Sequence, residues 1–502
     1  MTRMDAHPRG DHRLPRSPGA VRRQGAGTAG LVAAAIAALA AGCQEPQADV
    51  SKTAAGLRAG VISRVEAPAP QPAPSGPAAL TVDRAIAEAV AASPQLAQMA
   101  SRVAAASEQV KMAEAAFYPR LVLSNDYTRT DNPVYAMMAI INQRRLDPAI
   151  NFNDPGVQSN LSTQLQAQWS VFDGGRSYYN QQAAGRQELG ARASLAAERN
   201  QLVAMVSQVY YQWLQARTFI AVAEQALNSA RTNEQLAEAR VAAQVSLESD
   251  LLRLKAARAE AEGQLLSAQG SASKLQAALE RLLVRHIGAE EVPAMDLKAG
   301  QSKIASTDPN ALVPEALAQR PEIEAAAAMI AAAADQVKAA KAGFLPSVVV
   351  HGQVQWDRED LRGAEDSWLA GVSVPWPLFE GGATQARLRQ ARATLREMQA
   401  RGEQVALDIA LEVHQAALGA REAQQRVEIA SQQLDYARQS HQDVRTQFQN
   451  QTATVEALLQ SEVAWQRAEA GYAAAAYEAK VAQAMLRRAL GQFAGEETQG
   501  NP

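Results

Sequence analysis

Six histidines and one cysteine are the residues of this 502-residue chain best suited to bind a metal or to attack a substrate. No two histidines are four residues apart, the spacing that places two imidazoles on one face of a helix. The histidines are His7, His12, His286, His351, His414 and His441. No phosphate-binding loop, Gly-x-Ser-x-Gly elbow or nucleophile–base pair is recognisable. We therefore expect no enzyme, no metal site and no cofactor.

The composition favours long packed helices. The 49 basic and 52 acidic residues give a net charge of −3, so there is no basic patch to favour nucleic acid as a partner. Aromatic residues make up 5% of the chain, while the hydrophobic set reaches 47%. That hydrophobic content is mostly Ala, Leu and Val, which suits helices packed at short spacing.

The N-terminal 42 residues have the features of a targeting segment. Several arginines precede an apolar run at 29–41, which is too short for a permanent transmembrane helix. The run ends at Cys43, the only cysteine, and resembles a bacterial lipoprotein signal in which this cysteine is lipidated, for example with palmitate. The alternative is an ordinary cleaved signal peptide with a buried free cysteine. Alternating prolines then predict an extended arm over residues 43–79.

One short motif occurs twice and marks the organisation of the chain. Trp169-Ser-Val-Phe-Asp-Gly-Gly175 returns as Trp376-Pro-Leu-Phe-Glu-Gly-Gly382, 207 residues later. Each copy follows alternating residues and precedes a long stretch of helix formers. An acidic residue can cap a helix, and glycine tolerates a sharp backbone bend. The motif therefore predicts strand-to-helix corners at Gly174, Gly175, Gly381 and Gly382.

The stretches after the two corners predict uninterrupted helices of about 70 residues. At ~1.5 Å per residue each would extend roughly 105 Å, longer than an ordinary domain. A shorter helix is expected at 81–117, with a break at Ser93-Pro94. Another shorter helix should follow each long helix, the first ending near Arg285 and the second near Phe493.

Four strands are expected, at 121–128, 161–171, 348–356 and 368–378. The second alternates apolar and polar residues over its whole length, so it has two distinct faces. A half-buried strand of a soluble sheet explains this pattern, and on this strand alone it is the simpler interpretation. A membrane strand of 9–11 residues has the same alternation. Turn-rich loops are expected at 129–160 and 357–367.

Further matches indicate an internal repeat. Ser93-Pro94 matches Arg320-Pro321 and Phe117-Tyr-Pro119 matches Phe344-Leu-Pro346, both offset by 227 residues. The predicted organisation is a signal peptide, the arm, two repeats, a connection between them and a tail: residues 1–42, 43–79, 80–285, 286–310, 311–493 and 494–502.

The repeated Phe-Asp/Glu-Gly-Gly corners and Phe-x-Pro helix ends resemble the TolC-type outer-membrane efflux family over about residues 80–493. The resemblance implies a mixed, mainly α fold in a homotrimer. Each chain would give four strands to a shared 12-stranded transmembrane β-barrel, which continues into a long α-helical barrel in the periplasm. The function implied is an exit duct that receives small molecules from an inner-membrane pump, of the resistance-nodulation-division or ABC type, through a periplasmic adaptor protein.

The resemblance also implies roles for particular residues. Leu161, Leu165, Trp169 and Val171 would face outer-membrane lipid, and Gln164, Gln166, Gln168, Gln353 and Gln355 would line the lumen. The tip that meets the adaptor would include Gln244, Ser246, Asp250, Gln451, Thr452 and Thr454. The glycine common in the family's tip turns is Gln244 or Gln451 here, and Ala457 and Gln460 replace acidic latch residues. Asp250 is either a gate residue or a helix N-terminal charge.

Two other functions remain compatible with the sequence. The same duct would serve type I protein secretion. In a protein of another class, the helices would form a periplasmic coiled-coil scaffold or adaptor lipoprotein with a small soluble sheet. The two classes differ at the strands, because only a membrane barrel would be disrupted by a charge on the apolar face.

Overall fold

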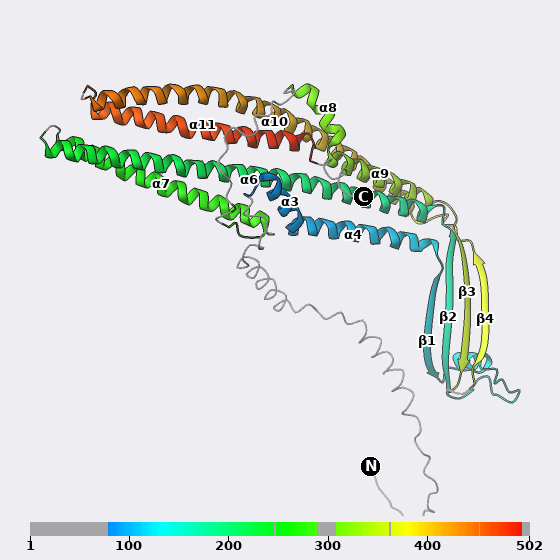
Figure 1. Ribbon diagram of the computed structural model, residues 1–502. Helices are drawn as coiled ribbons and strands as arrows, with labels where there is room; N and C mark the ends of the chain where they lie inside the picture. The colour runs from blue at the N-terminus through cyan, green and yellow to red at the C-terminus, as the bar shows by residue number, and fades with distance from the viewer. Residues whose placement is uncertain are drawn as a thin grey trace, which may run out of the picture. The chain divides into compact units, whose positions relative to one another are not determined.

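The structure, a computed structural model, describes residues 79–244, 247–288, 291, 308–360, 363–450 and 452–493. The expected signal peptide, Cys43, nearly all of the rest of the arm and the tail lie outside these residues, as does most of the 286–310 connection. The described part is mainly helical and contains one four-stranded sheet (Figure 1). The mainly α class with four strands, expected from the sequence, is confirmed.

Two helices of 67 residues form the frame of the helical part, and each has shorter helices along it. The long helices are α6 (Arg176–Ala242) and α10 (Ala383–Gln449), which confirms the predicted uninterrupted helices. α6 packs against α4, α7, α9 and α11, and α10 packs against α8, α9 and α11 (Figure 1). The shorter helices are α3 (Val82–Ala92), α4 (Pro94–Glu114), the 3-10 turn η1 (Ala115–Phe117), α7 (Glu248–Leu283), α8 (Pro309–Gln319), α9 (Pro321–Ala342) and α11 (Val455–Ala489).

The break between α3 and α4 lies where the sequence predicts it. Ser93 leaves the helical conformation, and its hydroxyl accepts a hydrogen bond of 3.3 Å from the Leu96 amide. Pro94 follows at the first helical position, where its missing N–H costs nothing. In the matching place of the second half, α9 begins at Pro321 without a side-chain cap.

The sheet is antiparallel, with the strands in chain order and both outer strands unpaired on one side within the described residues. Its members are β1 (Arg120–Thr130), β2 (Gln158–Phe172), β3 (Val348–Arg358) and β4 (Glu365–Ser373). The fourth strand was expected at 368–378, and that prediction is wrong at both ends. Pro375 and Pro377 have no N–H to donate to a ladder, so the strand ends before them.

The segment between β1 and β2 is not simply the loop expected at 129–160. It contains the helix α5 (Pro133–Asn142). The Asn132 side chain accepts hydrogen bonds from Val134 and Tyr135, and Pro133 occupies the first turn. The sequence interpretation took all of 129–160 as turns and loop, whereas the pair Asn132-Pro133 also suits the start of a helix.

The two largest apolar cores among the described residues each lie along one of the long helices. In the first, Trp213 and Val206 of α6 pack with Leu279 of α7 and with Ala85 and Ala89 of α3. The second contains α10 residues spaced four and seven apart on one side of the helix, packed against α8 and α11: Ile409, Val413 and Ala420. Large side chains such as Trp213 and Leu279 fill the first core, whereas alanines make up almost half of the second and allow close approach of its helices.

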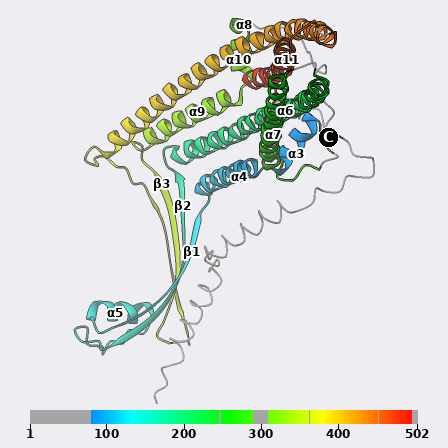
Figure 2. The same ribbon diagram turned by 90° about the vertical axis from the view of Figure 1, so that its left-hand side faces the viewer.

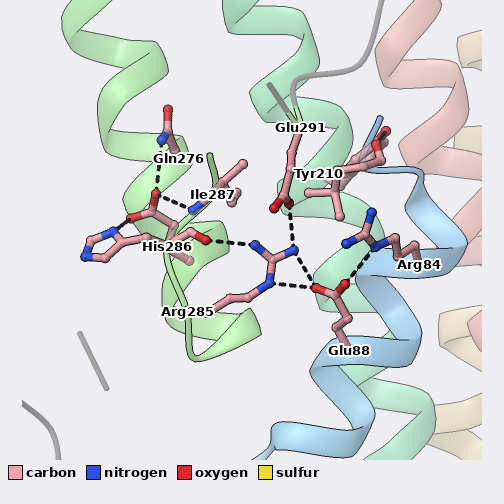
Figure 3. Close-up of polar contacts among 10 residues, drawn as sticks. Arg84, Glu88, Tyr210, Gln276, Arg285, His286, Ile287 and Glu291 are labelled. Carbon is pink, nitrogen blue, oxygen red and sulfur yellow. Dashed lines mark hydrogen bonds and ion pairs between the residues drawn. The ribbon is translucent and has the colours of Figure 1, made fainter. Parts of the chain in front are cut away.

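A buried ionic network joins the start of the described chain to the end of α7 (Figure 3). Arg285 lies 2.7 Å from Glu88 of α3 and 2.8 Å from Glu291. Next to it, the Leu80 amide donates to the Glu291 carbonyl, and the Leu80 carbonyl accepts from the Tyr210 hydroxyl, both at 2.7 Å. Burial, helped by neighbouring tyrosines and an aspartate, raises the pKa of Tyr210, which remains a donor. The chain therefore enters the helical part at a fixed point on α6.

A second arginine joins the corresponding elements of the other half. Arg320, between α8 and α9, bridges Glu322 and Glu412 at 2.8 and 3.0 Å. Its guanidinium also donates to the carbonyls of Arg488 and Ala489 at the end of α11. Each half thus uses a buried arginine to fasten the end of a short helix.

Candidate channel faces and helix tips

All four predicted corner glycines have positive φ, between 60° at Gly381 and 86° at Gly382. Left-handed backbone of this kind favours glycine because other residues suffer a clash of Cβ with the backbone. The repeated tryptophan and phenylalanine motifs meet at these corners. The Trp169 indole donates to the Phe117 carbonyl at 2.9 Å, and the Trp376 indole donates to the Phe344 carbonyl at 3.1 Å.

The acidic residues of the two corners act differently. The Asp173 carboxylate accepts from the backbone amides of Gly175 and Ser177, at 3.1 and 2.8 Å, and so caps α6 as expected. The Glu380 carboxylate instead contacts side chains, the Thr384 hydroxyl and the Arg387 guanidinium. The longer glutamate side chain contacts side chains one turn or more into α10 and does not cap the first backbone amides of that helix.

The two corners also differ in how tightly they are packed, which gives a prediction. A Cβ at Gly174 would lie 2.8 Å from the Ala342 carbonyl oxygen, whereas a Cβ at Gly381 would meet open space. We expect Gly174→Ala to lower the free energy of unfolding by clearly more than Gly381→Ala. The left-handed backbone alone costs roughly 1–2 kcal/mol at either site. Thermal unfolding followed by circular dichroism tests this, and equal losses would contradict the packing argument.

The five glutamines predicted to line a lumen share one face of the sheet. The register pairs Gln164 with Gln355 and Gln166 with Gln353, while Gln168 lies opposite His351. The Gln353 amide donates to Gln355 at 2.9 Å, and Gln355 donates to Asp357 at 2.7 Å. This produces a continuous polar ladder across β2 and β3.

The other face of the sheet is apolar and exposed. Leu165 lies opposite Val354 and Leu123, and Trp368 of β4 lies opposite Val354. Leu123 is 70% exposed and Trp368 is 77% exposed in the single chain. An apolar surface running across all four strands indicates contact with lipid or with another protein.

Two of the predicted tip residues, Ser246 and Gln451, lie outside the described residues. Gln244 adopts a left-handed φ of 62°, a conformation that glycine adopts without steric strain. Asp250 lies in the first turn of α7, where a negative charge stabilises the helix N-terminus. The Thr452 hydroxyl donates to the Gln447 carbonyl, and the Thr454 hydroxyl caps α11 by accepting from Ala457. These contacts are local, and a role in adaptor binding stays a prediction.

The sequence did not reveal a polar contact between the first hairpin, α6–α7, and the second hairpin, α10–α11. Glu462 of α11 is 4% exposed, and its carboxylate accepts a hydrogen bond of 3.0 Å from Asn233 of α6. Burial raises the pKa of this carboxyl. Hydrogen bonds to the carboxylate and the nearby positive charge of Arg445 both lower the pKa, but by less. Nearby, His441 stacks on Trp465 with ring centroids 5.0 Å apart, and burial lowers the pKa of this histidine. Asn233, His441 and Glu462 border a groove of about 410 Å³.

Closer to the tips, a second contact joins the hairpins. The Arg240 guanidinium of α6 lies 4.5 Å from the centre of the Phe448 ring of α10 and donates to the Phe448 carbonyl at 3.4 Å. No spacing in the sequence relates residues that are 208 positions apart in two different helices. Only the packing of α6 against the second hairpin reveals them.

The raised pKa of Glu462 predicts how stability changes with pH. The folded chain holds this proton more tightly than the unfolded chain, so stability falls as pH rises above the ordinary value of 4.5. We expect Glu462→Gln to raise the melting temperature at pH 8 and to lose that advantage near pH 4.5. Glu422→Gln, at a well-exposed side chain, is the control and should show no such trend. A pH-independent difference would contradict the assignment.

Neither a helical membrane span nor a metal cluster is found in the part of the chain that the structure describes. No helix there is both long and apolar enough to cross a membrane. No three His, Cys, Asp or Glu side chains gather there as metal ligands would.

Comparison with known proteins identifies the family. The model of the outer membrane efflux protein family matches residues 85–284 and 312–492. The chain belongs to this family. Protein CyaE of Bordetella pertussis is 26% identical over 430 residues, 84% of this chain and 86% of its own length. Outer membrane efflux protein BepC of Brucella suis is 23% identical over 294 residues, 57% of this chain and 58% of its own.

Solved structures share the fold of this outer membrane efflux protein. The open-state outer membrane channel MtrE of Neisseria gonorrhoeae has a TM-score of 0.71 at 20% identity, over 84% of this chain and 91% of its own. The TolC-type resemblance seen in the sequence is therefore confirmed. The family and fold are those of channel proteins.

Proposed function

We propose that this outer membrane efflux protein is the exit duct of a tripartite efflux system. Three copies would pool their sheets into a 12-stranded barrel in the outer membrane. Their long helices would continue the duct into the periplasm. Small molecules would pass through it from an inner-membrane pump to the exterior without chemical change.

The observation that carries the proposal is a sheet whose two faces have opposite polarity and whose outer strands each have an unpaired edge within the described residues. An open sheet edge leaves backbone N–H and C=O groups unpaired, which promotes aggregation in water and is costly in lipid. Closing the sheet into a barrel pairs these groups. The four strands have 9 to 15 residues, and a tilted membrane strand needs about 9–11. The glutamine ladder would then line the lumen, and Leu165, Trp169 and Trp368 would face lipid.

The finer assignments are those that the sequence and its family resemblance imply. Cys43 would carry a lipid anchor in the outer membrane, with residues 43–79 as its arm. The two segments matched by the family model support the division into repeats at 80–285 and 311–493. The turns at the far end of α6 and α10 would meet a periplasmic adaptor protein, and the pump would be of the resistance-nodulation-division or ABC type.

Accumulation of an efflux dye tests this function. In cells that lack this protein, we expect ethidium to accumulate to a higher level than in the parent, and expression of the full chain to restore the low level. Pump and adaptor must be present in the strain for rescue. Unchanged dye accumulation together with loss of a secreted polypeptide would favour the protein-secretion alternative. No change in either, with the protein in the soluble periplasm, would favour a scaffold.

A further inference from the structure

The helix α5 carries apolar residues on the side away from the sheet as well as on the side packed against it. Ala136 and Ile140 are buried, and α5 packs against β2. Val134, Tyr135 and Met138 are between 53% and 69% exposed. The helix contains no charged residue. An uncharged helix with a second apolar side left in water needs a cover.

Hydrogen bonds fix α5 to the polar face of the sheet. Gln143, at its C-terminal end, donates to the Asn160 side chain at 2.9 Å and to the Ser159 carbonyl at 2.8 Å. Asn160 in turn donates to Asp357 at 2.7 Å. Asn160 and Asp357 alternate with the apolar residues of β2 and β3, so they share a face with the glutamine ladder. Asp357 is only 1% exposed, as expected if the β1–β2 segment covers it.

The chain after α5 is fastened across the ends of the strands. The Arg144 guanidinium lies 3.1 Å from Glu365 and donates to the Asp366 carbonyl at 3.0 Å, both at the start of β4. Arg145 lies 2.6 Å from Glu359, just beyond β3. The segment that leaves β1 is therefore tied to the far strand, and α5 lies against the strand ends (Figure 2).

We propose that the exposed side of α5 packs against the same helix of two further copies and forms an apolar constriction at the outer mouth of the duct. This inference rests on the proposed function. Barrel closure turns the polar faces of three sheets toward one axis, so a helix held on that face lies inside the mouth and away from lipid. Three uncharged helices approach there without repulsion. An apolar constriction resists the passage of water and ions by dewetting, yet yields to apolar molecules.

Photo-cross-linking from two positions tests this proposal. The photoreactive residue p-benzoylphenylalanine replaces Tyr135 on α5 or Leu123 on the edge strand β1, in the full chain in intact outer membranes. We expect both positions to give a covalent product between two copies of the chain. A Leu123 product without a Tyr135 product, or a lipid adduct at Tyr135, would overturn the constriction but keep the barrel. No product at Leu123 and no trimer would overturn the proposed function itself.

Conductance provides a second readout. The double variant Tyr135→Ser, Met138→Ser is expected to raise the single-channel conductance of the purified trimer in a planar bilayer several-fold. Phe152→Ser, which changes another exposed apolar residue of the β1–β2 segment outside α5, is the control and should leave conductance unchanged. Equal conductance of the double variant and the parent would contradict a constriction at α5.

Discussion

Replacing Leu165 with arginine is expected to abolish assembly in the outer membrane, whereas the same replacement at Gln166 is expected to leave it intact. The two residues are neighbours on β2, so they differ only in the face on which they lie. An arginine on a lipid-facing position near the bilayer midplane costs about 2–4 kcal/mol per chain. Three chains would bear that cost together. On the polar face, the arginine would meet glutamines and water.

Membrane fractionation followed by gel electrophoresis without heating measures this difference. The Leu165→Arg chain should be degraded or found outside the outer membrane, and the Gln166→Arg chain should run as the parent does. A periplasmic scaffold with a small soluble sheet predicts a weaker effect, because an arginine on an exposed face reaches water. Normal assembly of Leu165→Arg would therefore argue against a membrane strand.

Replacing Arg285 with methionine is expected to destabilise the helical part by about 3–5 kcal/mol, the range for breaking a buried ion pair. The Arg285 side chain is 12% exposed and bridges two carboxylates (Figure 3). Although burial alone would lower it, the carboxylates of Glu291 and Glu88 hold the pKa of Arg285 above its ordinary value. After the change, Glu88 keeps Arg84 at 2.8 Å, but Glu291 is left buried without this partner.

The matched control for Arg285 is Arg192→Met on α6. Arg192 pairs with Glu188 four residues away, its side chain is 62% exposed, and such surface pairs contribute about 0.3–0.5 kcal/mol. Denaturant unfolding monitored by circular dichroism compares the two variants. If the two variants lose similarly small amounts of unfolding free energy, the Arg285 network does not fasten α3 to α7. If Arg285→Met loses outer-membrane assembly as well as stability, the variant is defective in folding.

The strands and corners were predictable because their information is local. Alternation over 161–171 defines two faces without reference to the rest of the chain, and the corner glycines have a backbone conformation that their residue type favours. The helix α5 was not predicted, because apolar residues on two sides remove the period that indicates an amphipathic helix. The end of β4 was misplaced because Val374, Trp376 and Leu378 continue the alternation past Pro375.

Long-range contacts between helices are the part of the site that the sequence did not reveal. Glu462 and Asn233 are 229 residues apart, and neither residue has a neighbour pattern that points to the other. Ala457 and Gln460 stand where the family resemblance implies acidic latch residues. The structure places the buried carboxylate of Glu462 and the Arg240–Phe448 contact between α6 and the α10–α11 hairpin. Packing of whole helices, rather than local spacing, determines such pairs.

The apparent mass of the protein extracted from outer membranes in mild detergent tests the duct most directly. Run on a gel without heating, it should migrate as a trimer, and heating should convert that band to a single chain with one third of the mass. The same fraction should contain nearly all of the protein. A monomer found only in the soluble periplasm, with or without heating, would contradict the account.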